Sequence, residues 1–183
     1  MVNKEFLSSP ILTARKALIR QVIANGDKPN LGFDEKRFPP EKTIYLSLLK
    51  ETGIHKSENG RYFFGKPQDV TLLPLWNVCE AILKSSSESI TSITEFYKKL
   101  RKAPFKLKQG FLDFWIHLFL VMKKEDYALY YNSEEYVPHL SSDMMDLIYK
   151  HPSKYCVKAL SADGVRSDYL GFYKELTGFN ESD

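Results

Sequence analysis

Asp113 and His117 lie four residues apart, a spacing that brings two side chains to the same face of a helix. A carboxylate that orients a histidine is half of a catalytic dyad, in which the histidine moves a proton. A complete site also needs a nucleophile or a metal ion, and the sequence identifies neither. We therefore interpret Asp113 and His117 as a largely buried structural pair in which each side chain satisfies the other.

The other catalytic patterns in the chain are incomplete. Gly65-Lys66 is followed by Pro67 and lacks the upstream glycine of a P-loop, so we expect no ATP hydrolysis. Ser47 and Lys50 have the SxxK spacing of some acyl-transfer enzymes, but the accompanying SDN and KTG motifs are missing. A GxSxG elbow, an HExxH helix and a dinucleotide fingerprint are also missing. We predict no catalytic residues, no enzyme activity and no cofactor.

Metal ligation and disulfide bonding are not expected either. Cys79 and Cys156 are far apart and form no CxxC motif, while His55, His139 and His151 fall at the ends of expected elements. The N-terminal sequence MVNKEFLSSPIL lacks the apolar stretch of a secretion signal, and no later stretch is long enough to span a membrane. We expect a protein of the reducing cytoplasm without membrane contact.

Basic residues are concentrated around an expected turn between two helices. Six of them lie within eleven residues: Lys98, Lys99, Arg101, Lys102, Lys106 and Lys108. The chain as a whole has a formal net charge of only +3, so no long-range field attracts nucleic acid. The cluster is either a solvated face, which is the commoner case and the one we favour, or a patch that contacts phosphates.

Tyrosines are concentrated in a later segment that we expect to be a β-hairpin. Tyr127, Tyr130, Tyr131 and Tyr136 could stack on bases or offer contact area to a protein. The β-propensity of tyrosine explains part of this enrichment. If the chain binds nucleic acid, we expect Tyr130 and Tyr131 to act together with the basic cluster.

The spacing of apolar residues and the turn signals predict a mainly α chain with two small β-hairpins. Ser92 and Glu95 fit a capping box at the start of one helix. A short strand is expected at 155–157, and the hairpins at 54–64 and 127–140. The expected helices lie near 11–25, 40–53, 72–83, 92–102, 107–123, 141–149 and 165–177.

The helix at 107–123 is apolar around most of its circumference, and only Gln109, Asp113 and His117 form a polar seam. A helix of this kind is buried in a core or faces a partner. The order of helix, turn, long helix, hairpin, short helix and strand between Ser92 and Val157 resembles a winged-helix domain. With the serine-rich run 85–89 as a boundary, we expect an N-terminal helical subdomain with a hairpin at 1–88 and a winged-helix-like subdomain at 89–183, or one continuous domain.

Several packing and turn motifs resemble the helical and winged-helix-like region of large bacterial P-loop ATPases, some of them associated with phage defence. They are Pro39-Pro40-Glu41-Lys42, Tyr45-Leu46-Ser47-Leu48-Leu49, Thr52-Gly53-Ile54-His55, Leu73-Pro74-Leu75-Trp76, Ala103-Pro104-Phe105-Lys106-Leu107-Lys108-Gln109-Gly110, Ala128-Leu129-Tyr130 and Tyr136-Val137-Pro138. The resemblance covers residues 10–178 and implies an accessory region of an NTP-driven machine. No nucleotide-binding motif is present, so no ATPase residue is carried over.

The sequence leaves two functions open. The first is a non-catalytic interaction and positioning module that docks on other domains of a parent protein or on an assembly partner. The alternative is a winged-helix domain that contacts the phosphates of double-stranded DNA non-specifically. An exposed aromatic surface would favour docking or a homodimer. We expect it to draw on Ile90, Tyr97, the exposed share of the hairpin at 127–136, and Tyr169, Phe172 and Tyr173, while some of these residues lie in the core.

Overall fold

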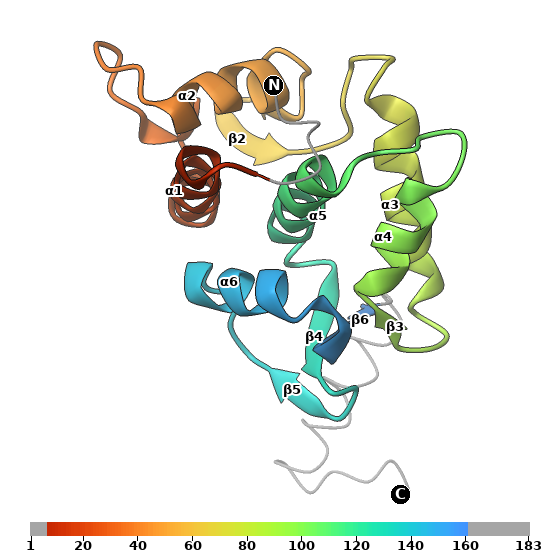
Figure 1. Ribbon diagram of the computed structural model, residues 1–183. Helices are drawn as coiled ribbons and strands as arrows, with labels where there is room; N and C mark the ends of the chain where they lie inside the picture. Colours follow the sequence, from red (N-terminus) through yellow and green to blue (C-terminus); the bar gives the residue numbers. More distant parts are fainter. Residues whose placement is uncertain (1–6, 161–183) are drawn as a thin grey trace, which may run out of the picture.

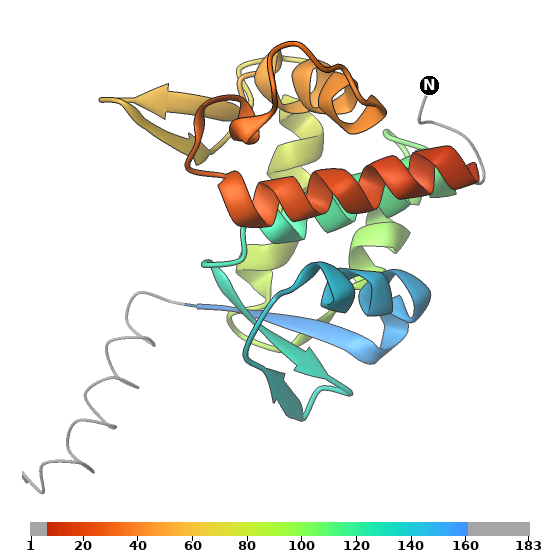
Figure 2. The ribbon, with the colours of Figure 1, turned by 90° about the vertical axis from the view of Figure 1, so that its left-hand side faces the viewer.

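The longest apolar helix, α5 (Gln109–Met122), runs through the middle of the computed structural model, which describes residues 7–160. Eleven of its fourteen residues are buried, so the expectation of a buried helix is confirmed. Around it lie helices α1 (Ser9–Asn25), α4 (Thr94–Arg101) and α6 (Ser142–Lys150). Figure 2 shows α1 lying along α5 for most of its length.

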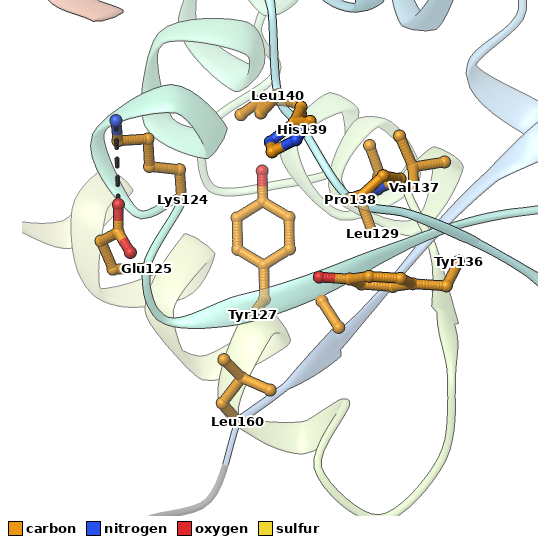
Figure 3. A pocket seen from close by; sticks show the side chains of 11 residues that line it. Lys124, Glu125, Tyr127, Leu129, Tyr136, Val137, Pro138, His139, Leu140 and Leu160 are labelled. Carbon is orange, nitrogen blue, oxygen red and sulfur yellow. Dashed lines mark ion pairs between the residues drawn. The ribbon is translucent and has the colours of Figure 1, made fainter. Parts of the chain in front are cut away.

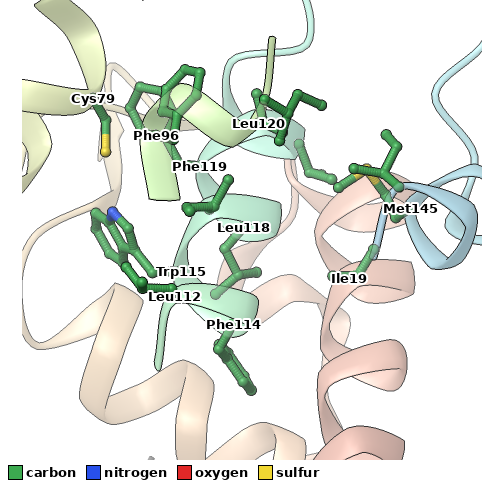
Figure 4. Packing of buried hydrophobic residues seen from close by; sticks show 14 of the residues in the cluster. Ile19, Cys79, Phe96, Leu112, Phe114, Trp115, Leu118, Phe119, Leu120 and Met145 are labelled. Carbon is green, nitrogen blue, oxygen red and sulfur yellow. The ribbon is translucent and has the colours of Figure 1, made fainter. Parts of the chain in front are cut away.

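Two further helices complete the α part of the described chain. Helix α2 (Pro40–Tyr45) continues into a π-helical turn (Leu46–Lys50), and α3 (Leu73–Ser85) carries Trp76 and Cys79 into the core. Figure 4 shows Cys79 and Phe96 close to Trp115 and Phe119 of α5, while Ile19 and Met145 approach α5 from the other side. The ring of Trp76 meets the ring of Phe119 edge-on, with centroids 5.3 Å apart. One core therefore draws on residues before and after the serine-rich run.

The first hairpin forms where the Asn59-Gly60 signal places it. Strands β1 (His55–Glu58) and β2 (Arg61–Phe64) pair antiparallel, and Asn59 and Gly60 both have positive φ, at 50° and 79°. This backbone conformation gives a two-residue turn whose twist matches that of the strands. The hairpin is held to the helices through His55, whose ring contacts the Tyr45 hydroxyl at 2.8 Å and the Gly26 carbonyl at 3.0 Å.

The second sheet has the strand order β3-β6-β4-β5, with every neighbouring pair antiparallel. Its strands are β3 (Thr91–Ser92), β4 (Tyr127–Tyr131), β5 (Glu135–Val137) and β6 (Tyr155–Ala159). The expected hairpin and the expected final strand are confirmed. Beside Leu129 in the centre lie Val157 on one side and Val137 on the other.

The start of α4 differs from the expected capping box. Ser92 belongs to β3 and pairs with Cys156, so α4 begins at Thr94 with Ile93 as its N-cap. The Ser92 hydroxyl accepts from the Thr94 N–H at 3.3 Å instead of from Glu95. Pairing with β6 holds Ser92 in an extended conformation, and this long-range contact could not be inferred from local sequence.

The serine-rich run is packed against the second sheet at one residue. Ser86 is buried, and its hydroxyl accepts from the Ala159 N–H of β6 at 2.8 Å while donating to the Leu83 carbonyl. Further along the chain, Ser141 caps α6 as expected, accepting from the Met144 N–H. The helix expected at 165–177 lies outside the described residues. Within 7–160, no helix combines the length and apolar character needed to cross a membrane.

Candidate functional site

Asp113 and His117 both lie in α5, but they do not satisfy one another. Two side chains donate to the Asp113 carboxylate: the Tyr97 hydroxyl at 3.1 Å and the Gln109 amide at 2.6 Å. His117 is completely buried, and neither of its ring nitrogens has a hydrogen-bond partner among the described residues. The prediction of a mutually satisfied pair is therefore wrong, because Tyr97 and Gln109 occupy the carboxylate.

A buried arginine of α1, Arg15, which the sequence analysis did not single out, belongs to the same cluster, because it and His117 both contact Tyr149, whose ring centroid lies 5.9 Å from that of His117. The Arg15 guanidinium is fully buried, donates to the Asp113 backbone carbonyl at 3.5 Å and to Asp146 at 3.3 Å, and lies 4.2 Å from the centre of the Tyr149 ring. Arg15 lies one residue after Ala14 and three before Leu18, at the margin of the apolar stripe. This position beside the apolar stripe is the feature of the sequence from which the burial of the Arg15 side chain could have been predicted.

Burial governs the protonation of this polar cluster. Burial, with the positive charge of Arg15 adding to it, lowers the pKa of His117 to about 3, so the ring is neutral at physiological pH. Burial also raises the pKa of Asp113, and the hydrogen bonds from Tyr97 and Gln109 oppose that rise. His117 is a poor proton-transfer group because its ring has no solvent contact and no partner that could receive a proton.

All six residues of the basic cluster are exposed, as the sequence analysis expected. They lie on α4 and on the connection from α4 to α5. Lys98 pairs with Glu95 at 2.6 Å, and Arg101 donates to the Gln109 side chain. Lys106 has a positive φ of 48°, a conformation that turns the chain sharply before α5.

The tyrosines of the second hairpin lie at the other end of α5. Tyr130 and Tyr131 belong to β4, which follows the C-terminal end of α5, whereas the basic cluster precedes its N-terminal end. At about 1.5 Å per residue, a helix of fourteen residues separates the two by about 21 Å. Figures 1 and 2 both show the α4–α5 connection and the second hairpin at opposite ends of α5. The structure thus does not bring the nucleic-acid-binding residues together into one patch.

Only part of the tyrosine hairpin is exposed, as the sequence analysis expected. Tyr127 is buried and donates to the Leu120 carbonyl, and Tyr130 and Tyr131 are half-buried. Tyr136 is the exception, with 57% of its surface exposed. Tyr97, expected at the surface, is buried because its hydroxyl reaches Asp113.

Strand β5 forms one edge of the second sheet and is flanked by two hollows. The first, of about 400 Å³, is lined by Tyr127, Tyr136 and Leu160, as Figure 3 shows. The second, of about 390 Å³, lies between the sheet and α6 and is lined by Val137 and Leu147 among others. Three large apolar side chains that line these hollows are substantially exposed: Tyr136 (57%), Leu147 (44%) and Leu160 (46%). We call these three residues and the two hollows the wing surface.

Among residues 7–160, no group of three or more histidine, cysteine, aspartate or glutamate side chains is placed to hold a metal ion. Comparison of the chain with family models, curated proteins and solved structures gave no match. The resemblance to a region of bacterial P-loop ATPases therefore stays a prediction.

Proposed function

We propose that the chain is a non-catalytic interaction and positioning module that docks on a protein partner through the wing surface. The observation that carries this proposal is the exposure of Tyr136, Leu147 and Leu160 in the lining of two hollows that flank an edge strand. An edge strand leaves backbone N–H and C=O groups free to pair with an added strand. Hollows beside such an edge can receive the side chains of that strand and so select it.

The proposal includes a winged-helix-like second half. Its support is the order α3, β3, α4, α5, β4, β5, α6 and β6, together with a sheet in which β6 lies between β3 and β4. In a helix-turn-helix module, the second helix of the pair reads the DNA major groove. That position belongs to α5, which is buried under α1, α4 and α6. This burial favours docking on protein over reading of bases.

The partner that we propose is another domain of a bacterial NTP-driven assembly, and this part rests on the sequence resemblance alone. We also propose a cytoplasmic location, which agrees with the two free, buried cysteines, Cys79 and Cys156, of the described residues. A docking role needs no catalytic group, so the buried and neutral His117 is assigned to the core.

Site-specific photo-crosslinking tests the docking role. A photoreactive phenylalanine analogue at Tyr136 should give one discrete adduct in cells that express the intact protein. The matched control is the same analogue at Val70, which is 78% exposed and precedes α3, outside the wing surface. Leu147→Asp should remove the Tyr136 adduct without changing the thermal midpoint. No discrete adduct from Tyr136, or the same adduct from both positions, would contradict the proposal.

Non-specific binding to double-stranded DNA is the second candidate, favoured by the six exposed basic side chains. Because α5 is covered, such binding would have to be confined to phosphates, and affinity would fall steeply with salt. Replacing Lys102, Lys106 and Lys108 by Gln should then weaken binding equally for all DNA sequences. It should also reduce the slope of the logarithm of the binding constant against the logarithm of the salt concentration by about 3. Measuring the affinity for a DNA duplex at increasing salt concentrations distinguishes the two candidates. If the chain does not bind the duplex at low salt, only protein docking remains.

A further inference from the structure

The C-terminal ends of α1 and α5 meet beside the first hairpin, around a hollow of about 660 Å³. Figure 2 shows the hairpin, the end of α1 and the turn that follows α5 on the same side of the molecule. The lining comes from 22–24 in the last turn of α1 and 26–27 after it, 62–64 of β2, and 121–126 at the end of α5 and in the turn that follows. This hollow is distinct from the wing surface, and the two share only the turn residues Lys124 and Glu125 in their linings.

We propose that this hollow binds a cationic side chain, arginine by preference, carried by the protein partner. The identity of the partner rests on the proposed function, but the chemistry of the hollow does not. Three features of its lining favour a cation: the ends of two helices, an excess of carboxylates and a row of aromatic rings.

Each helix presents a negative dipole end to the hollow, because its last carbonyls have no partner within the helix. Among the described residues, no hydrogen-bond donor is recorded for the carbonyls of Ile23, Ala24 or Met122. Two helix ends of this kind in one hollow add their partial negative charges. A guanidinium, with five N–H donors, can bond to several such carbonyls at once.

The charged side chains around the hollow have a net negative charge. Lys123 lies 3.0 Å from Glu80 and 3.0 Å from Asp126, and Lys124 lies 3.7 Å from Glu125. Both lysines are therefore already matched by carboxylates. Asp27 is exposed, lines the hollow and has no ion-pair partner among the described residues. A cationic ligand would supply the missing charge.

Aromatic rings from β2 form the third part of the lining, with Tyr62 and Phe64 half-buried and Phe63 38% exposed. A guanidinium binds to the face of such a ring. It is more weakly hydrated than an ammonium, so its transfer from water into the hollow costs less free energy. The ring of Phe63 lies 5.8 Å from the Lys56 ammonium, within the range of a cation–π contact.

The test is an NMR titration of the full chain with N-acetyl-arginine amide, with N-acetyl-citrulline amide as the neutral isostere. We expect arginine to shift backbone signals at 22–27, 62–64 and 121–126, and citrulline to leave them in place. Asp27→Asn and Phe63→Leu should each weaken arginine binding about three- to tenfold, from the magnitude of one ion pair or cation–π contact. Asp143→Asn, an exposed carboxylate on α6, should not change the affinity.

Equal shifts with arginine and citrulline, shifts that map elsewhere, or no shifts would each overturn the proposal. Unchanged affinity in both Asp27→Asn and Phe63→Leu would do the same. These outcomes are independent of the Tyr136 crosslink, because that experiment reports on the wing surface. A negative titration with a positive crosslink would leave the docking role intact, and the reverse result would leave the hollow intact.

Discussion

At the residue scale, His117 is the side chain with the clearest consequence for stability. Its pKa of about 3 in the folded chain lies below the ordinary value of 6.5, so the unfolded chain takes up the proton first as the pH falls. The stability from the neutral ring is therefore complete above about pH 6.5 and is lost toward pH 3, at about 1.4 kcal/mol per pH unit.

We predict that His117→Leu reduces this pH dependence. It should also stabilise the chain at pH 7 by about 1 kcal/mol, since two buried nitrogens without partners are removed. Urea unfolding at pH 7 and pH 5 measures both effects. His55, whose pKa is also lowered by burial, keeps a slope of the same sign in both proteins. The exposed His139→Leu is the control, and an equal slope in both variants would contradict the prediction.

Lys42 is buried, and none of the carboxylates between residues 7 and 160 pairs with it. Its ammonium donates to the carbonyls of Asp34, Glu35 and Arg37 at 2.7, 3.2 and 2.9 Å, and so fixes the loop that precedes α2. We predict that Lys42→Met lowers the free energy of unfolding by about 2 kcal/mol, because charge-assisted hydrogen bonds are lost.

Hydrogen exchange checks this prediction locally as well as globally. Amides in the loop at 33–38 should exchange faster in Lys42→Met, while those of α5 should change only with the global stability. Lys36→Met, an exposed lysine in the same loop, should behave like the natural sequence. Unchanged loop exchange in Lys42→Met would show that the three carbonyl contacts do not hold the loop.

At the element scale, Arg15 joins α1 to α5 and α6. Its partner Asp146 is 21% exposed and also pairs with Lys16 at 2.7 Å. Removing Asp146 leaves the charge of the fully buried Arg15 uncompensated, whereas removing Arg15 leaves Asp146, which is partly exposed and still paired with Lys16. We predict that Asp146→Ala costs about 2 kcal/mol and that Arg15→Met stays within about 1 kcal/mol of the natural sequence.

Chemical denaturation of the two variants under one condition gives the comparison. A larger loss in Arg15→Met than in Asp146→Ala would mean that the hydrogen bond to the Asp113 carbonyl and the contact with Tyr149 stabilise the chain more than the ion pair does. Burial lowers the pKa of Arg15, and Asp146 is the nearest charge that opposes this effect.

At the scale of the whole molecule, one hydrophobic core crosses the expected boundary at 88. It contains Leu18 and Trp76 from the first half and Trp115, Leu129 and Val157 from the second. We predict a single cooperative thermal transition for the full chain, with equal calorimetric and van't Hoff enthalpies. Residues 1–88 alone should not fold, because they lack α5. Two separate transitions, or a cooperative melt of the fragment, would contradict this.

The sequence by itself determined the local elements of the described chain. The apolar stripes specify the helices, Asn59-Gly60 specifies the first turn, and Ser141 specifies the start of α6, because each signal acts over a few residues. The burial of α5 was also predictable. A helix that is apolar around nearly its whole circumference would expose apolar side chains to water in any orientation at the surface, so it is stable only inside the core.

The tertiary structure alone decided which side chains meet. Asp113 accepts from Tyr97 of α4, His117 packs against Tyr149 of α6, and Ser92 joins a strand instead of a cap, each through a contact with another segment. The basic cluster and the tyrosine hairpin had the right composition for one nucleic-acid surface, yet α5 holds them at its opposite ends. Spacing along the chain fixes neighbours within an element, but packing between elements fixes the site.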